Sequence, residues 1–271
     1  NYSEENDSWV LISQAIGFQV NFLGFKFDGK FSSAYSNYNF NPNINESSFT
    51  NEVLSFAKEA TKKDSVYWEK IRPVPLTLEE IKDYSTKDSI KVVRKSKKYQ
   101  DSLDAKRNKL GWFDPITGYT FRNSYKDWSI SYNGPLLKTS FNPVQGFHSS
   151  AGIRYFKRQN DTGKWWSLGV NVNYGFADKR ARPTLFFSKK WNNISRPRIS
   201  ITGGVKTAQF NDRDSFLLAN NAFSALFDKD NYLKIYEKSF AQISFSNEIK
   251  NGIFLNTSLE YANRKPLFNT T

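Results

Sequence analysis

Apolar and polar residues alternate almost without a break from Lys164 to Phe176. Side chains of a β-strand point alternately to its two faces, so this pattern predicts a strand with one apolar and one polar face. The residues of the polar face are Ser, Gly and Asn, all of them small. The apolar face carries Trp166, Leu168, Val170, Val172, Tyr174 and Phe176.

The same alternation recurs along the chain and predicts roughly eight to ten strands, many of a length that crosses a bilayer when tilted. Short polar turns separate the strands, among them Asn160–Lys164 and Asn251–Gly252. Strands joined by short turns form an antiparallel meander rather than βαβ units. The further alternating stretches are 14–22, 127–134, 146–156, 198–205, 242–249 and 251–261.

Two stretches interrupt this alternation and predict helix instead. Within residues 43–110, Thr77 and Glu80 have the spacing of a capping box that opens a helix. The second stretch is 214–227, where Ser215 is placed to cap a helix with apolar residues on one side. The sequence therefore predicts a strand-rich chain that is interrupted by helical segments.

Composition indicates what covers the apolar faces of the strands. The chain has 24 Phe, 14 Tyr and 7 Trp, whereas a soluble domain draws its core mainly from Leu, Ile and Val. The opposite faces carry Ser, Gly, Asn and Thr, which suit the wet interior of a membrane barrel, while a soluble sandwich would expose Lys and Glu there. A soluble β-sandwich or barrel is the alternative.

We therefore predict an all-β fold, an antiparallel up-and-down transmembrane β-barrel that is part of a larger barrel. Residues 1–271 would form the barrel region, and residues 43–110 would be a helical and loop segment inserted in it. Trp and Tyr gather at the two interfaces of a membrane barrel. The residues predicted to face lipid or to belong to this girdle are Trp165, Trp166, Leu168, Val170, Val172, Tyr174 and Phe176.

The net charge of the chain indicates further classes of partner. The chain carries 39 Lys and Arg against 26 Asp and Glu, a net charge of +13, which favours nucleic acid, anionic lipid or an acidic partner. The basic excess is dense in residues 87–109, but Tyr99 is the only aromatic residue there and no RNA-binding motif is present. A solvated helix or a contact with anionic head groups therefore fits this stretch better than nucleic acid does.

The sequence holds no set of residues that predicts catalysis or metal binding. Cysteine is absent, and His148 is the only histidine, which argues against a zinc site. Ser149 and Ser150 follow His148, but neighbours on a strand point to opposite faces, so we interpret His148 as a polar residue of the lumen. Glu79 and Glu80 fit a role in capping and in the helix dipole. We expect no enzyme, no cofactor and no metal.

The stretch VYWEKIRPVPLT, Val66–Thr77, is the candidate for a specific function within the insertion. It would be a plug or a partner-docking segment, or else an ordered loop over the barrel mouth. We expect Tyr67 and Trp68 to be buried against barrel strands, and Arg72 to pair with a carboxylate or with backbone carbonyls. The candidate residues are Tyr67, Trp68, Arg72, Pro73 and Pro75.

Four blocks of the chain carry a resemblance to a known family. Asn51–Ile90 resembles the signature of a large outer-membrane family of the Bacteroidota, in which a barrel domain of unknown function follows a carboxypeptidase-regulatory-like domain. FNPVQGF (141–147), NYGFADKRARP (173–183) and LEYANRKPLFNTT (259–271) resemble further landmarks in the same order. The resemblance implies that this chain is part of the barrel region. It implies no peptidase activity and no catalytic residues.

Pattern and resemblance together predict a non-enzymatic outer-membrane β-barrel protein of a Gram-negative bacterium. It would act as a channel, a transport component or a scaffold for envelope proteins. The expected partners are outer-membrane lipid and lipopolysaccharide, together with other outer-membrane or surface proteins, and no nucleic acid. Two alternatives stay open: an outer-membrane lipid hydrolase, and a soluble β-rich binding module.

Overall fold

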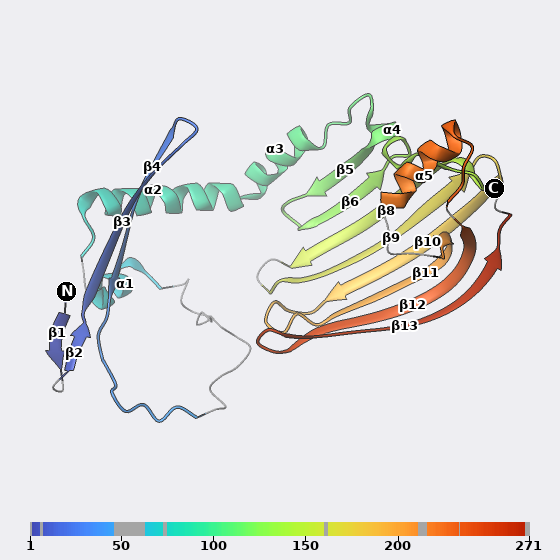
Figure 1. Ribbon diagram of the computed structural model, residues 1–271. Coiled ribbons are helices and arrows are strands. Elements are labelled where there is room, and N and C mark those ends of the chain that lie inside the picture. The colour runs from blue at the N-terminus through green and yellow to red at the C-terminus, as the bar shows by residue number, and fades with distance from the viewer. Residues whose placement is uncertain are drawn as a thin grey trace. The chain divides into compact units, whose positions relative to one another are not determined.

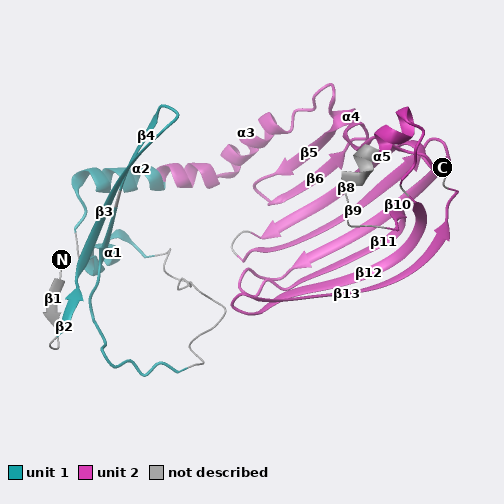
Figure 2. Cartoon of the chain, in the orientation of Figure 1, with its two compact units in different colours: residues 1–49, 53–88 teal, residues 50–52, 89–271 magenta. Residues whose placement is uncertain are grey.

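The chain divides into two compact units, residues 1–49 with 53–88 and residues 50–52 with 89–271 (Figures 1 and 2). No helix in the described part of the chain is both long enough and apolar enough to cross a membrane. The computed structural model describes residues 2–5, 8–45, 63–72, 75–159, 162–210, 216–232 and 234–268.

Two antiparallel hairpins begin the first unit. β3 (Ser13–Phe22) confirms the strand that alternation predicts at residues 14–22, and it pairs along its whole length with β4 (Phe25–Ala34). Leu23 and Gly24 join them with φ angles of 46° and 82°, the positive values that a two-residue hairpin turn requires. The other hairpin consists of β1 (Tyr2–Glu5) and β2 (Ser8–Leu11).

Two helices follow, α1 (Ser65–Ile71) and α2 (Leu78–Lys95). The predicted capping box opens α2: the Glu80 backbone N–H donates to Thr77 Oγ1 at 3.2 Å, and the Thr77 backbone N–H donates to Glu80 Oε2 at 2.8 Å. These two bonds satisfy donors that a helix start leaves free. Along α2, a hydrogen bond and charge attraction from Asp83 raise the pKa of Lys87.

The second unit is built on one antiparallel sheet in the order β13-β12-β11-β10-β9-β8-β6-β5, with β7 paired to β8 beside β6 (Figure 1). This order confirms the predicted meander, because nearly every strand pairs with its neighbour in sequence. β5 and β13 lie at the two ends of the order, and no described pairing joins them. The strands are β5 (Gly118–Asn123), β6 (Trp128–Asn133), β7 (Ser140–Asn142), β8 (Gly146–Gln159), β9 (Lys164–Gly175), β10 (Arg180–Lys190), β11 (Arg198–Gln209), β12 (Ile235–Lys250) and β13 (Ile253–Pro266).

Short helices accompany the sheet. α5 confirms the helix predicted from its apolar residues, and the rings of Phe223 and Phe227 lie 4.6 Å apart on it; the predicted cap, Ser215, lies outside the described residues. Asn251 and Gly252 form the predicted turn between β12 and β13, with Gly252 at φ 78°. The helices are α3 (Lys97–Arg107), α4 (Asp114–Thr117), the 3-10 turn Leu136–Lys138 and α5 (Phe216–Phe227).

One row of apolar side chains crosses the entire sheet at a single level. Each member stands directly opposite the next, so all of them lie on one face. Six of the eight are exposed, from 40% for Phe121 to 73% for Leu259. The row consists of Phe121, Ile130, Tyr155, Leu168, Phe187, Ile201, Ile243 and Leu259.

The other face of the sheet is polar and buried. On β9, Ser167 is 1% exposed and Gly169 is buried, while Leu168 between them is 50% exposed. Among the described residues only five hydrophobic side chains are buried, two of them alanine or valine. The second unit is therefore mostly β and antiparallel, as predicted, with its exposed apolar row on one face and small polar residues such as Ser167 on the more buried face.

Candidate functional site

The predicted lipid-facing residues all belong to β9 and the turn after it. The even-numbered members from Trp166 to Phe176 lie on the exposed apolar face, with Val172 37% and Phe176 58% exposed. Trp165 lies on the opposite face, because adjacent strand residues alternate. The predicted set thus divides six to one between the two faces.

Aromatic side chains border the apolar face at both ends. Near the start of β9, the rings of Trp128 and Tyr155 lie 6.0 Å apart, and those of Tyr155 and Trp166 lie 4.9 Å apart. Near its end, Tyr174 and Phe176 meet edge to face at 5.3 Å. Trp166 and Tyr174 are eight residues apart on one strand, which corresponds to about 27 Å along it. A membrane barrel carries an apolar band about 25 Å tall between aromatic girdles.

A cluster of buried charges lies at the Tyr174 end of the sheet, on the polar face. Arg182 is 1% exposed, and its Nε donates to Glu237 Oε2 at 3.0 Å. Its Nη2 donates to Asp178 Oδ2, while its Nη1 has no hydrogen-bond partner among the described residues. A buried guanidinium is tolerated when carboxylates pair with it, so Asp178 and Glu237 make the burial of Arg182 possible.

Amide side chains extend this cluster. Gln145 is fully buried; its Oε1 accepts from Asn142 Nδ2 at 3.0 Å and from Thr207 Oγ1 at 3.3 Å. Gln145 Nε2 donates to Asn173 Oδ1 at 2.8 Å. Asn173 Nδ2 in turn lies 3.2 Å from His148 Nδ1. The network joins β7, β8, β9 and β11 through hydrogen bonds rather than through apolar packing.

The buried cluster was not predicted as a site, although a signal for it existed. Its residues come largely from the blocks FNPVQGF (141–147) and NYGFADKRARP (173–183), which carry the family resemblance. The structure brings these blocks together, since β8 pairs with β9 and Gln145 bonds Asn173. The blocks therefore mark residues that fix strand ends to one another.

The cluster contains no paired nucleophile and base within the described residues. Ser149 Oγ donates to the carbonyl of Pro135 at 2.6 Å, and Ser150 Oγ accepts from Asn173 Nδ2 at 3.0 Å. Neither hydroxyl is bonded to His148, as nucleophilic activation requires. Within the described part of the chain, no group of three or more His, Cys, Asp and Glu residues is placed to hold a metal ion.

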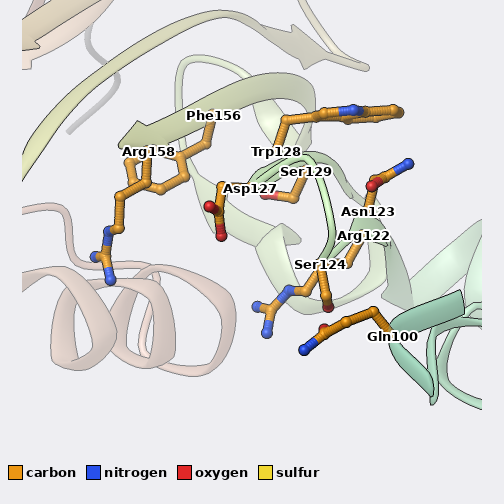
Figure 3. Close-up of a pocket in the computed structure, with 9 residues that line it drawn as sticks. All are labelled: Gln100, Arg122, Asn123, Ser124, Asp127, Trp128, Ser129, Phe156 and Arg158. Carbon is orange, nitrogen blue, oxygen red and sulfur yellow. The ribbon is translucent and has the colours of Figure 1, made fainter. Parts of the chain in front are cut away.

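A polar pocket of about 390 Å³ lies between α3, the β5–β6 turn and β8. α3 is held there by Asp104, whose carboxylate accepts from the Ser124 backbone N–H at 2.5 Å and from Ser124 Oγ at 2.7 Å. In Figure 3, Gln100 of α3 faces the pocket from one side, and Phe156 and Arg158 of β8 line the other. With hydroxyls, amides and guanidinium groups around it, this pocket is suited to binding a polar group.

The candidate plug residues lie on α1 and beside it. Tyr67 and Trp68 are 41% and 39% exposed, and their rings meet edge to face at 5.5 Å. The guanidinium of Arg72, a half-buried residue, lies 5.4 Å from the centre of the Tyr84 ring in a cation–π contact. The burial of this segment against strands stays a prediction. Pro73 lies outside the described residues, and Pro75 is exposed.

Comparison with known proteins gives one family. Residues 113–271, more than half of the chain, match the model of the C-terminal domain of DUF5686, a family of unknown function. The matched range contains the three later landmark blocks, whereas Asn51–Ile90 precedes it. No curated protein and no solved structure matches the chain.

Proposed function

Because the chain belongs to the DUF5686 family, whose function is unknown, we propose a function from the surface that its sheet presents. The sheet of β5 to β13 lies in an outer membrane as part of a β-barrel, with lipid against its apolar face. Strands β8 to β13, each of 11 residues or more, span the bilayer. The protein acts there without catalysis, as a channel, a transport component or a scaffold for envelope proteins. Outer-membrane lipid and lipopolysaccharide are its surroundings.

The observation that carries this proposal is the exposed apolar row across eight strands. In water, each fully exposed Leu, Ile or Phe forgoes about 1.5–3 kcal/mol relative to its buried state. Contiguous apolar patches on soluble monomers are seldom larger than a few hundred Å². A row that continues from Phe121 to Leu259 is more extensive than the apolar patches of such monomers. Contact with lipid removes the free-energy cost of exposing these side chains to water.

The polar face supports the same proposal. Ser188 and Ser200 share a hydrogen bond of 2.9 Å across strands, and Thr120 and Ser131 share one of 3.1 Å. A Cβ atom on Gly169 would lie 2.4 Å from the ring of Phe186, so this face is crowded as well as polar. Polar, closely packed side chains are typical of the interior of a membrane barrel.

The alternatives have less support from the geometry. A soluble β-rich module would bury its apolar face, whereas here the polar face is the buried one. A lipid hydrolase needs an activated nucleophile, and the hydroxyls beside His148 are engaged elsewhere. The exposed apolar row of the sheet therefore favours the membrane proposal over both alternatives.

Reconstitution tests the proposal. The purified chain should refold only with detergent or lipid vesicles, resist extraction by alkaline carbonate, and migrate differently on electrophoresis before and after boiling. Planar-bilayer conductance then separates a channel from a closed scaffold. A chain that stays monomeric and folded in buffer without any amphiphile, and remains in the supernatant when mixed with vesicles, overturns the membrane proposal.

A further inference from the structure

A larger pocket, of about 710 Å³, lies at the Trp166 end of the sheet, with lining residues from both faces. Its walls come from the adjoining ends of β8, β9 and β10, from the end of α2 and from the β5–β6 turn, and all its lining residues belong to the second unit. Six lining residues are Lys or Arg, three are Trp, and Asp127 is the single acid. The six basic residues are Lys95, Lys157, Arg158, Lys164, Lys189 and Lys190.

Strand register arranges these cations around the tryptophans. Trp166 stands directly opposite Lys157 on β8 and Lys189 on β10, so the three share the apolar face. Directly opposed Cβ atoms are about 5 Å apart, which places the two lysines about 10 Å from each other with the indole between them. On its apolar side, the pocket therefore combines one aromatic residue with two lysines that flank it at the border of the apolar band.

The positive charges of the pocket outnumber the acids in its lining by six to one. None of the ion pairs within the described part of the chain involves Lys157, Arg158, Lys164 or Lys189. Lys189 instead lies 5.3 Å from the ring centre of Trp191. Like charges held at neighbouring positions repel one another, so an external anion between them lowers the energy of this arrangement.

We propose that this pocket binds phosphate, and that the headgroup of an anionic membrane lipid supplies it. The inference rests on the proposed function, since only a membrane-embedded sheet brings a headgroup to the border of its apolar face. The Lys157 and Lys189 ammonium groups contact the phosphate oxygens, while Trp166 lies against the glycerol and upper acyl region, where tryptophan is enriched. The acyl chains then follow the apolar side chains along β9, from Leu168 to Val170 and Val172.

Quenching of tryptophan fluorescence tests the proposal in detergent-solubilised protein. The probes are dibrominated phosphatidylglycerol and dibrominated phosphatidylcholine, titrated separately. The Lys157→Gln/Lys189→Gln variant should need about 25-fold more phosphatidylglycerol for half-maximal quenching than the parent, from about fivefold per lysine near an anionic surface. Its response to phosphatidylcholine should not change.

The matched control is Lys179→Gln/Lys229→Gln, which removes the same two charges away from the pocket and should behave like the parent. Equal weakening in both double variants, or no weakening in the first, overturns the proposal. Unbrominated phosphatidylglycerol should compete with the brominated lipid and reverse the quenching, whereas millimolar inorganic phosphate should not. If inorganic phosphate reverses it as readily, lipid is overturned as the source of the phosphate. The membrane proposal itself is refuted by a different result, namely a chain that is folded and soluble without detergent.

Discussion

An arginine introduced on the apolar face of β9 distinguishes lipid from water at that face. Val170 is four residues from both Trp166 and Tyr174, so it is at the middle of the band between the aromatic residues. In the membrane proposal this is the bilayer midplane, where arginine costs about 2–4 kcal/mol. If water covers the face, Val170→Arg is a surface substitution and costs within about 0.5 kcal/mol.

Two control variants introduce the same arginine at other positions of the same sheet. Ala181 stands opposite Tyr174 on the same face but at the border of the band, so Ala181→Arg should cost only about 0–1 kcal/mol. Asn171 lies on the polar face opposite Gly152, where an added charge meets no lipid in the membrane proposal, so Asn171→Arg should cost less than Val170→Arg.

The assay is equilibrium unfolding by urea from lipid vesicles, followed by tryptophan fluorescence. A loss of about 2–4 kcal/mol changes the folding equilibrium by roughly 30-fold to 1,000-fold, since about 1.4 kcal/mol corresponds to a factor of ten. The expected order of destabilisation is Val170→Arg above Asn171→Arg and above Ala181→Arg. Equal costs at positions 170 and 181, or costs near zero at both, would refute the assignment of this face to lipid.

Three further predictions concern the buried cluster and α2. Arg182→Ala should lower the free energy of unfolding by about 3–5 kcal/mol, because it leaves Asp178 without its cation and Glu237 with only the exposed Arg180. Arg180→Ala removes only that exposed partner of Glu237 and should change it by less than about 1 kcal/mol; denaturant unfolding measures both. Thr77→Ala should cost about 1 kcal/mol locally and speed amide hydrogen exchange in the first turn of α2. Because Asp83 raises the pKa of Lys87, their pair stabilises α2 below the ordinary lysine pKa of about 10.4 and is lost as pH rises through the raised value. The helicity difference between parent and Asp83→Asn, measured by circular dichroism, should therefore be present at pH 8 and disappear as the pH rises through the raised pKa of Lys87.

The strands were predictable because each carries its own signal. Alternation over residues 164–176 depends only on neighbours in sequence, and β9 follows it residue by residue. The capping box at Thr77 is equally local. The opposite orientation of Trp165 follows from the same alternation that places Trp166 on the apolar face, so the sequence already contained it.

The buried cluster was beyond a single sequence for a physical reason. Arg182 and Glu237 are separated by 55 residues, and their contact depends on how β10, β11 and β12 are registered. Register is set by the whole face of a sheet and by its turns, not by the two residues that meet. Arg182 in ADKRARP therefore gives no indication that the distant Glu237 will neutralise it.

The two ends of the apolar band differ in whether carboxylates of the chain neutralise their positive charges. This difference predicts how the sheet is oriented in a membrane. At the Tyr174 end, Arg182 is buried and neutralised by two carboxylates of the chain itself. At the Trp166 end, Lys157 and Lys189 stay exposed, with one acidic residue in a pocket of six cations. The pocket of six cations at the second end therefore gains energy from an anionic surface, by about 1 kcal/mol for each basic residue near it. If the sheet spans a membrane, the Trp166 end should accordingly face the leaflet with the higher density of phosphate.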